Sequence, residues 1–399
     1  MLLGHIVRVG GDHRPVEHSL ALPRSLFHED LHLSGAIVDA TFAVRKPPLL
    51  EQLQSRDVPY VVDPEALRFG SDAYEDVDRL AALPYAPAAP ITSSTTDDDI
   101  HRFVIGSLTL QAQVDATAYI APCLPLDNNG DALKLNRRLV HAARDELGVE
   151  VDRRPLIVSV APATRVLGDP APIAQMLADV PADGVHVQPL RFRPTELSLA
   201  TLERYCDYLA ALQTLGIGVM AGRVGAFGLV LLALGVDGFD SGLTTAEAFD
   251  LNSAIRSARK RRHRDADERP TEGGGRKRRF YLTQLKTTVM APVMAVIDTP
   301  SMRYRFTSSL PCCTAGFGGY LEHAREHCLF ARTEEAANLM REAPTLRTAT
   351  LAAQLAEARD TATVLTRSLA ARQMNAPSFE HLERWRRLLL GRAKGARAA

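Results

Sequence analysis

The chain has 399 residues, 47 Lys and Arg residues balance 47 Asp and Glu residues, and 46% of the residues are hydrophobic. This composition is typical of a folded globular protein and excludes a chain that is disordered throughout. The balanced charge excludes a protein that is basic along its whole length. The length allows two or three ordinary domains, or one large barrel with additions.

No segment is expected to enter a membrane. The most apolar run, 227–236, is shorter than the stretch of about 18 apolar residues that a spanning helix needs. The first residues lack the basic and long apolar stretches of a signal peptide. Five cysteines are too few for a disulfide scaffold in a chain of this length. We therefore expect a cytoplasmic protein without membrane contact.

Short apolar runs alternate with helical patterns from residue 35 to about residue 242. Seven runs are rich in Val and Ile and apolar on both faces, which is typical of strands buried in a parallel sheet. They are 36–42, 58–63, 117–123, 155–160, 184–190, 216–221 and 236–240. Helices are expected between them, over 47–54, 98–114, 131–147, 170–177, 195–215 and 226–234.

Seven such alternations favour an α/β fold of the (β/α)₈ TIM-like barrel type. The alternative is an open Rossmann-like sheet, but no G-x-G-x-x-G motif follows an early strand. We expect an N-terminal extension over 1–34, the barrel core over 35–252, a basic flexible insertion over 253–279, the end of the barrel with a cysteine-containing segment over 280–340, and a C-terminal helical cap over 341–399.

Polar residues follow several predicted strands, at the face where barrel enzymes carry their active sites. Asp63 and Asp240 end two different strands and are expected to face one pocket. Paired carboxylates are a usual arrangement for a nucleophile and an acid/base group. The alternative is that each is a capping or loop residue.

A basic surface is expected around this pocket. The insertion 253–279 holds eleven Lys and Arg residues against four Asp and Glu residues, and it follows the Asp240 strand in sequence. Clusters of this kind neutralise phosphates, although a solvated linker is the alternative. The C-terminal segment, with Trp385, adds a basic amphipathic helix. The residues expected to bind substrate or nucleic acid are Gln188, Arg191, Arg193, Arg223, Arg259, Lys260, Arg261 and Arg262.

Three segments resemble the tRNA-guanine transglycosylase family. AIVDATF, followed by a double proline and later by PYVVDPEALRF, is similar to the family's opening strands. GIGVMAGRVGAFGLVLLALGVDGFDSGLTTAEAFDLN is similar to its late segment, which carries a Phe-Asp dipeptide after a short strand and helix. CCTAGFGGYLEHAREHCLFARTEEAANL resembles a degenerate form of its zinc segment. The resemblance covers roughly residues 34–340.

The resemblance implies a reaction and gives roles to two aspartates. The family's nucleophile falls on Asp240 and its acid/base aspartate falls on Asp63. The carboxylate would attack the anomeric carbon as one base leaves, and a second base would then displace it with net retention. The implied partners are a polymer, tRNA or DNA of the kind modified with 7-deazaguanine, and a small nucleobase.

The chain departs from the family where the base is read. The family's guanine-reading aspartate falls near Ala121, which cannot accept a hydrogen bond through its side chain. Its glycine-rich strand ends are replaced at 158–161 and 188–193. A site built to hydrogen-bond one base rejects others strongly. The departures therefore imply a different base, a different reaction or lost activity.

The zinc segment keeps one family ligand, Cys313, where four are needed for a closed tetrahedral site. A rearranged site is one interpretation, with His323 and His327 expected on one helix face. An apolar packed substitute without metal is the favoured one, since adjacent cysteines rarely share an ion. The candidate ligands are Cys312, Cys313, His323 and Cys328.

The sequence thus predicts a transglycosylase-like pentosyltransferase that exchanges or modifies a nucleobase in tRNA or DNA. A catalytically silent homologue that binds nucleic acid or a partner is the first alternative. A phosphate- or flavin-binding barrel oxidoreductase is the second, suggested by Gly222-Arg223-Val224-Gly225 before a helix. Homo- and hetero-oligomers both remain open.

Overall fold

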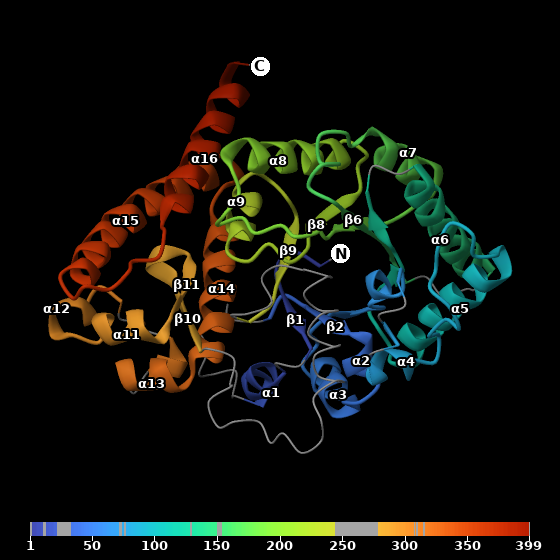
Figure 1. Cartoon of the computed structure of the whole chain (residues 1–399), viewed down its shortest axis with the longest axis horizontal. Coiled ribbons are helices and arrows are strands. Elements are labelled where there is room, and N and C mark those ends of the chain that lie inside the picture. Colours follow the sequence, from blue (N-terminus) through green and yellow to red (C-terminus); the bar gives the residue numbers. More distant parts are fainter. Residues whose placement is uncertain are drawn as a thin grey trace.

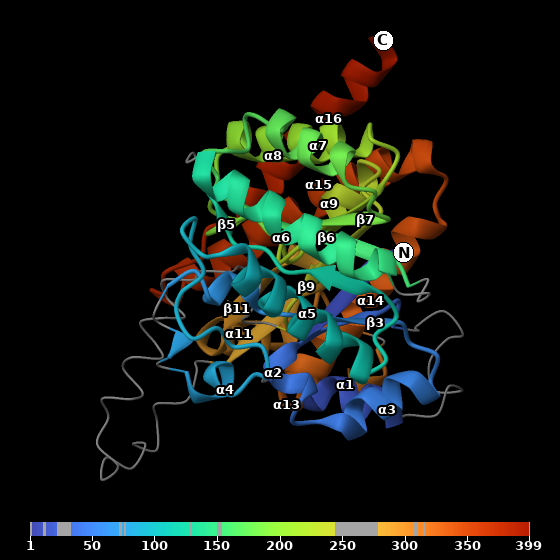
Figure 2. The ribbon, with the colours of Figure 1, turned by 90° about the vertical axis from the view of Figure 1, so that its right-hand side faces the viewer.

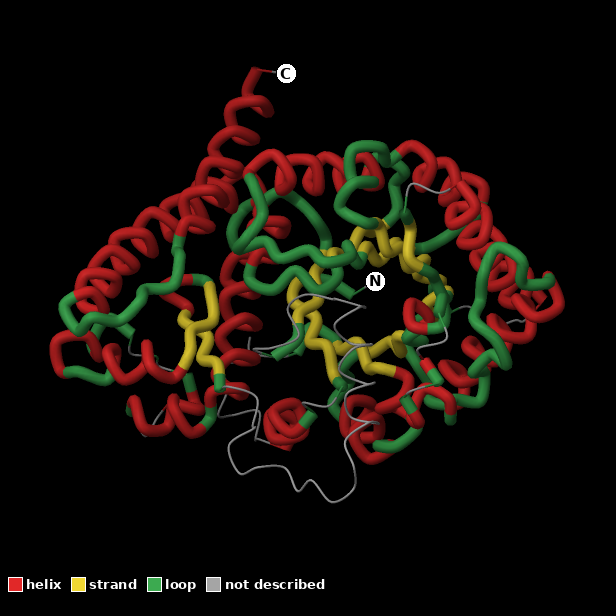
Figure 3. The backbone as a smooth tube through the Cα atoms, viewed as in Figure 1, coloured by secondary structure: helices red, strands yellow, loops and turns green. Residues whose placement is uncertain are grey.

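The computed structural model describes residues 2–10, 13–21, 33–71, 74–75, 77–127, 130–149, 154–243, 278–306, 308, 310–313 and 316–398. Eight parallel strands form a ring surrounded by helices, seen as the ring of strands in Figure 3. Their order is β3-β2-β1-β9-β8-β7-β6-β4, and a parallel bridge between Val61 and Ala118 joins the two ends. The prediction of an α/β TIM-like barrel is confirmed.

The strands of the ring are β1 Gly4–Val9, β2 Ala36–Asp39, β3 Tyr60–Asp63, β4 Tyr119–Ala121, β6 Leu156–Pro162, β7 Gly184–Val187, β8 Gly218–Ala221 and β9 Gly238–Ser241. The short strand β5, Pro125–Leu126, pairs with β6. The helices between strands are α1 Arg14–Ala21, α2 Ala40–Ala43, α3 Pro47–Ser55, α4 Asp78–Ala81, α5 Asp97–Gln113, α6 Gly130–Val149, α7 Ala171–Asp179, α8 Leu199–Gln213 and α9 Phe227–Ala233.

The remaining helices are α11 Ala291–Ile297, α12 Pro300–Arg303, α13 Phe317–Glu322, α14 Ala324–Arg341, α15 Pro344–Ala370 and α16 Glu380–Ala398. They lie beside the barrel, with α14 against β1 and α9 (Figure 1). The expected C-terminal helices are therefore present as α15 and α16, which pack on each other and on α9. The last turns of α16 extend beyond the other helices (Figure 2). Among the described residues, no helix has both the length and the apolar character needed to cross a membrane.

Strand β1 differs from the expectation that residues 1–34 form an extension outside the barrel. Gly4–Val9 lies between β2 and β9, with Val7 opposite Ala36 and Ile6 opposite Asp240. His5 and Arg8 interrupt the apolar run in this strand, so it lacks the pattern that revealed the other seven.

The segment after residue 279 also differs from the expected end of the barrel. Strands β10 (Arg279–Leu282) and β11 (Thr287–Met290) pair antiparallel in a sheet of their own. They lie on the far side of α14 from the barrel (Figures 1 and 3). Because β1 and β9 already pair with each other, the ring has no place for a further strand there.

The barrel interior consists of an apolar layer beneath a polar one. Side chains at the amino-terminal end form a buried apolar cluster of Leu2, Ile6, Ile37, Val61, Ala118, Ile120, Ile157 and Met220. Alternate residues of a strand point to the same face, so the residue two positions later also points inward. In β1, β2 and β3 that residue is Arg8, Asp39 and Asp63. The strands thus place a polar layer at their carboxyl ends.

A prediction concerns the contact between α9 and β9. A Cβ atom on Gly228 would lie 2.0 Å from a ring carbon of the buried Phe239. We expect Gly228→Ala to destabilise the fold by at least about 1–3 kcal/mol, the usual cost of overpacking. Urea unfolding measures the change. Gly391→Ala in α16 is the control, because its Cβ would meet nothing within 4 Å. Equal stability of the Gly228 and Gly391 variants would contradict the packing described.

Candidate active site

The polar layer is organised by one buried cation, Arg8 of β1. The residue is 5% exposed, so its charge needs partners within the protein. Nη1 donates to Asp63 Oδ2 at 2.6 Å and to Asp39 Oδ1 at 3.2 Å, while Nε donates to Asp240 Oδ1 at 3.0 Å. Nη2 lies 3.4 Å from Gln188 Oε1 and 3.5 Å from Asp240 Oδ2. One guanidinium therefore joins carboxylates from β2, β3 and β9.

Asp240 is completely buried and is held as an anion. Burial alone would raise the pKa of Asp240, but the Arg8 charge and the hydrogen bond from His186 outweigh it and hold that pKa well below the ordinary value. His186 Nε2 lies 2.6 Å from Asp240 Oδ2. The carboxylate thus accepts hydrogen bonds at both oxygens.

Asp63 lies at the carboxyl end of β3, with 11% of its side chain exposed. Burial raises the pKa of this carboxyl, and the charges of Arg8 and Arg223 overcome that effect and lower it. The backbone N–H of Glu65 donates to Asp63 Oδ1 at 2.8 Å. Burial and the neighbouring Asp39 act on Glu65 in the opposite direction and raise its pKa. Glu65 faces Thr41 and Arg68 rather than Arg8.

Arg223 and Gln188 complete the layer. Arg223 follows β8 with a φ of +56° and turns inward, so that Nε donates to Gln188 Oε1 at 3.3 Å and Nη2 lies 4.0 Å from Asp39 Oδ1. Burial and the charge of Arg8 lower the pKa of Arg223 to about 10. We call the set of Arg8, Asp39, Asp63, His186, Gln188, Arg223 and Asp240 the Arg8 cluster. It contains three carboxylates and two guanidinium groups.

Between β7 and β9, beside the contact of His186 with Asp240, there is room only for a glycine, Gly222. A Cβ at this position would lie 2.5 Å from His186 Nε2, 2.6 Å from Gln188 Cγ and 3.1 Å from Asp240 Oδ2. The absence of a side chain therefore lets His186 reach Asp240 across β8.

An apolar group lies at the same end of the barrel, across from β1 and β9 in the ring. Leu67, Cys123 and Ala161 form a buried cluster that Leu190 contacts. Burial raises the pKa of the Cys123 thiol to about 12, which excludes it as a thiolate nucleophile at neutral pH. The carboxyl ends of the strands thus carry a small apolar group beside the charged groups.

The structure places the expected binding residues in different settings. Gln188 and Arg223 belong to the Arg8 cluster. Arg223 therefore lies within the polar layer, whereas a position on the basic surface was expected. Arg191 and Arg193 are exposed after β7, and Arg193 pairs with Glu196 at 3.6 Å. Trp385 is 1% exposed and donates to Pro194 O, so it belongs to the core. The expected contacts Arg259, Lys260, Arg261 and Arg262 lie outside the described residues.

Sequence reasoning missed three members of the cluster as site residues: Arg8, Asp39 and His186. Arg8 lay in the segment assigned to an extension. Asp39 lies two positions after the inward Ile37, and His186 lies two positions before the inward Gln188, so each could have been found as a polar residue at an inward position near the end of a strand.

The cysteine segment brings together Cys312, Cys313 and His327. The two sulfurs are 3.6 Å apart, and His327 Nδ1 lies 3.9 Å from Cys312 Sγ and 3.3 Å from Cys313 Sγ. Hydrogen bonding from the Cys312 thiol lowers the pKa of Cys313 to about 5 although burial opposes it, and the same contact raises the pKa of Cys312. Cys313 is therefore favoured as a thiolate.

Two expected ligands are not part of this group. His323 adopts φ −105° and ψ 39° between α13 and α14, so it does not share a continuous helix face with His327. Its ring lies instead 6.4 Å from that of His18. Cys328 follows His327 on α14 and is completely buried, but its donor atom is not within the group. Of the expected ligands Cys312, Cys313, His323 and Cys328, the structure thus groups Cys312 and Cys313, and it adds His327.

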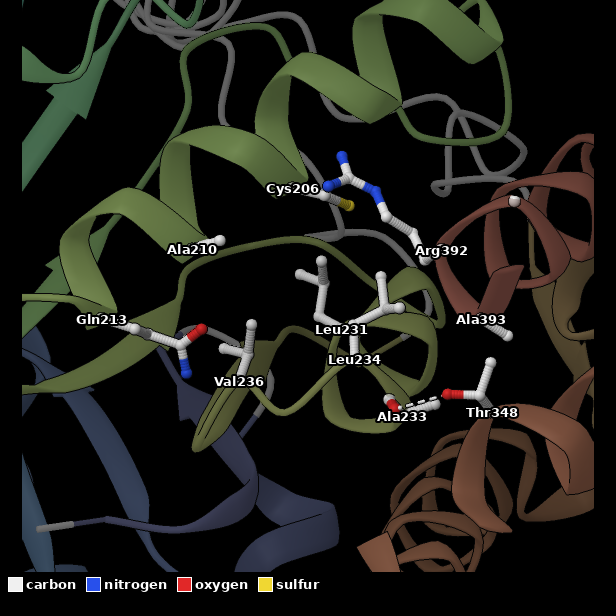
Figure 4. A pocket seen from close by; sticks show the side chains of 11 residues that line it. Cys206, Ala210, Gln213, Leu231, Ala233, Leu234, Val236, Thr348, Arg392 and Ala393 are labelled. Carbon is white, nitrogen blue, oxygen red and sulfur yellow. Dashed lines mark hydrogen bonds between the residues drawn. The ribbon is translucent and has the colours of Figure 1, made fainter. Parts of the chain in front are cut away.

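Two cavities lie away from the Arg8 cluster. One, of about 480 Å³, lies between α8, α9, α15 and α16 (Figure 4). Its polar groups are engaged, because Arg392 pairs with Asp207 and Thr348 donates to Ala233 O. Burial raises the pKa of its cysteine, Cys206, to about 12. The other, of about 250 Å³, is lined by Ser71, Thr92 and Asp127 among others.

Comparison with known proteins gives distant structural similarity to barrel enzymes. No family model matches the sequence, and no curated protein matches it. An intracellular xylanase from Thermoanaerobacterium saccharolyticum matches with 11% identity and a TM-score of 0.35, covering 63% of this chain and 86% of that chain. A candidate deoxyribose-phosphate aldolase from Toxoplasma gondii matches with 13% identity and a TM-score of 0.35, covering 65% of this chain and 94% of that chain. Similarity at this level carries no conclusion about activity.

A prediction tests the charge balance around Arg8. Arg8→Met would leave Asp63 and Asp240 buried without their cation, and we expect a loss of about 3–5 kcal/mol of stability at pH 7. Both carboxyls have lowered pKa values in the folded wild type, so their contribution is present above the ordinary pKa and is lost as the pH falls. In the variant those pKa values rise, so the carboxyls can become neutral at pH 5. The difference in the free energy of unfolding between wild type and variant should therefore be smaller at pH 5 than at pH 7.

Urea unfolding at both pH values measures this difference. Arg102→Met is the control, because Arg102 pairs with Asp99 on the exposed face of α5 and such pairs contribute about 1 kcal/mol or less. A deficit of the Arg8 variant that is the same at pH 7 and pH 5 would assign its effect to packing rather than to charge.

Proposed function

We propose that the chain is a barrel enzyme of the transglycosylase type, which exchanges or modifies a nucleobase in RNA or DNA with Asp240 as nucleophile. The observation that carries the proposal is the joint placement of Asp240 and Asp63 on the guanidinium of Arg8, at the carboxyl ends of β9 and β3. This is the face where barrel enzymes hold their catalytic groups.

The electrostatics suit a carboxylate nucleophile. A nucleophilic carboxylate must be ionised before it attacks, and Arg8 and His186 keep Asp240 ionised. In the proposed reaction, Asp240 forms a bond to the anomeric carbon as the bond to the departing base breaks. An incoming base then displaces the carboxylate, and the two inversions give net retention. The apolar group of Leu67, Cys123 and Ala161 lies at the same end of the barrel, where it would make the surroundings of a bound base partly apolar.

Nucleic acid is proposed as the polymer because of the basic segment 253–279, which follows β9 in sequence, and of the exposed Arg191 and Arg193. Lys and Arg clusters bind phosphates in a salt-dependent manner. The target base would have to leave its stack to reach the barrel, as in other enzymes that act on bases. The charge balance favours this arrangement over a phosphate bound within the Arg8 cluster, because three carboxylates there face two guanidinium groups. The oxidoreductase alternative is correspondingly less supported.

The test is a search for a covalent adduct. Purified chain is incubated separately with total tRNA, duplex DNA and single-stranded DNA, with and without free 7-deazaguanine, and analysed on a denaturing gel. We expect a polymer-linked band with the wild type and none with Asp240→Asn, which cannot attack but should keep its affinity for the polymer. Binding without an adduct in either protein would favour a non-catalytic binding protein, and an undiminished adduct in the variant would exclude Asp240 as the nucleophile.

We also propose that Cys312, Cys313 and His327 bind a zinc ion. Tetrahedral zinc with bonds of about 2.3 Å to sulfur and 2.0–2.1 Å to nitrogen separates its donor atoms by about 3.5–3.8 Å. The three observed separations, 3.6, 3.9 and 3.3 Å, are close to this triangle. The lowered pKa of Cys313 supports a thiolate ligand. Three protein ligands leave the fourth position to water or another ligand.

Cobalt substitution tests the metal proposal. Chain freed of metal with a chelator should bind Co²⁺ with the absorbance of thiolate coordination, and Cys313→Ser or His327→Gln should lose it. Cys206→Ser is the control, since that buried cysteine lies outside the group. The same cobalt spectrum in the wild type and in both ligand variants would contradict this site.

A further inference from the structure

His186 has one ring nitrogen in use and one without a partner. Nε2 lies 2.6 Å from Asp240 Oδ2, and the side chain is completely buried. Nδ1 is also buried and has no hydrogen-bond partner among the described residues. A buried polar atom left unpaired costs stability, so an unpaired atom at such a position calls for an explanation.

The ionisation of Asp240 fixes which nitrogen carries the hydrogen. An ionised carboxylate only accepts hydrogen bonds, so Nε2 must donate to Oδ2. In a neutral imidazole the other nitrogen then carries the lone pair. Nδ1 is consequently a proton acceptor whose orientation is set by a carboxylate on the opposite side of the ring. An aspartate behind a histidine has the same function in Ser-His-Asp sites, where it sets the tautomer and stabilises the imidazolium.

The other titratable groups nearby are less suited to carry a proton. Asp63 is bonded at Oδ2 by Arg8 and at Oδ1 by the backbone of Glu65. Glu65 has a raised pKa and an Oε1 atom without a hydrogen-bond partner among the described residues, but its carboxyl faces Thr41 and Arg68 rather than Arg8. Arg8 and Arg223 are cations with carboxylate partners. His186 alone combines a place in the inward layer with a nitrogen that no described residue engages.

The position of His186 is fixed by the frame of the barrel. In the sheet register, His186 lies opposite Ser159 on β6 and Met220 on β8. Gln188, two positions later, points to the same inner face of the barrel. Gly222 leaves the space through which the ring contacts Asp240. The dyad is thus built into three adjacent strands rather than into a loop, and strands hold catalytic groups with small positional error.

We propose that His186, rather than Asp63, is the acid/base residue of this site, with Nδ1 as the atom that exchanges the proton. The inference rests on the proposed function, because it takes base exchange at the Arg8 cluster as the reaction. Before the first half-reaction Nδ1 takes a proton from water, which makes the ring an imidazolium. As Asp240 attacks the anomeric carbon, the bond to the departing base breaks and its ring nitrogen takes that proton from Nδ1. In the second half, the incoming base gives its ring N–H proton to Nδ1 as its nitrogen bonds to the anomeric carbon and Asp240 leaves as a carboxylate. Each cycle therefore returns the histidine to its starting state.

The first arm of the test does not depend on activity. Chain labelled with ¹⁵N-histidine is examined by two-bond ¹H–¹⁵N NMR at mildly alkaline pH, and His186→Gln assigns the signal. We expect His186 to carry its hydrogen on Nε2 with Nδ1 bare. A hydrogen on Nδ1 and a bare Nε2 would overturn the proposal, because no lone pair would then be available on the unpartnered side.

The second arm separates catalysis from positioning. Glutamine at position 186 can still donate an N–H to Asp240 but cannot carry a proton, so a merely structural role would be rescued by His186→Gln. We expect both His186→Gln and His186→Ala to lose about 100-fold or more of base exchange on the polymer that forms the adduct, in line with general acid–base contributions. His381→Gln is the control, since His381 of α16 is a similarly buried histidine that is hydrogen-bonded to Leu285 O.

The outcomes distinguish this proposal from the proposed function. Full turnover of His186→Gln, with an adduct in the wild type, would remove the histidine from the mechanism and leave Asp240 as nucleophile. Absence of exchange by the wild type on every polymer would withdraw both proposals.

Discussion

The burial of one guanidinium group is the constraint on which the rest of the site depends. Arg8 lies inside the barrel above a buried apolar cluster, so its charge can be accommodated only if carboxylates surround it. Asp39, Asp63 and Asp240 meet this need from β2, β3 and β9. A shift of one residue in any of these strands would turn its aspartate to the outer face. The cluster therefore ties the register of four strands to one charge.

The same constraint divides the chemical roles. Arg8 lowers the pKa values of Asp63 and Asp240 and keeps both as anions, which suits attack on carbon and makes them poor carriers of protons. The imidazole of His186 touches the cluster at one nitrogen only and keeps the other for exchange. One site can support both nucleophilic and acid–base chemistry when its neighbouring groups lie in environments that favour different protonation states.

The barrel could be predicted from the sequence because most of its strands are continuous apolar runs, and Asp63 and Asp240 could be found because they end such runs. Arg8 could not, since a charged residue within a strand argues against burial until its partners are known. Those partners lie 31, 55 and 232 residues away, and only the closed ring brings them together. The group of Cys312, Cys313 and His327 could likewise not be predicted from the sequence. The break at His323 between α13 and α14 decides which histidine reaches the cysteines.

The most direct test of this account is the titration of the Asp240 side chain. Carboxyl ¹³C NMR of aspartate-labelled chain, with Asp240→Asn to assign the signal, reports its ionisation while the chain remains folded. We predict that Asp240 stays ionised well below the ordinary aspartate pKa of 3.8, because Arg8 and His186 bind its charged form. A carboxyl that titrates at or above that ordinary value would show that Arg8 does not hold it as an anion, and the nucleophile, the histidine tautomer and the organisation of the cluster would all have to be reconsidered.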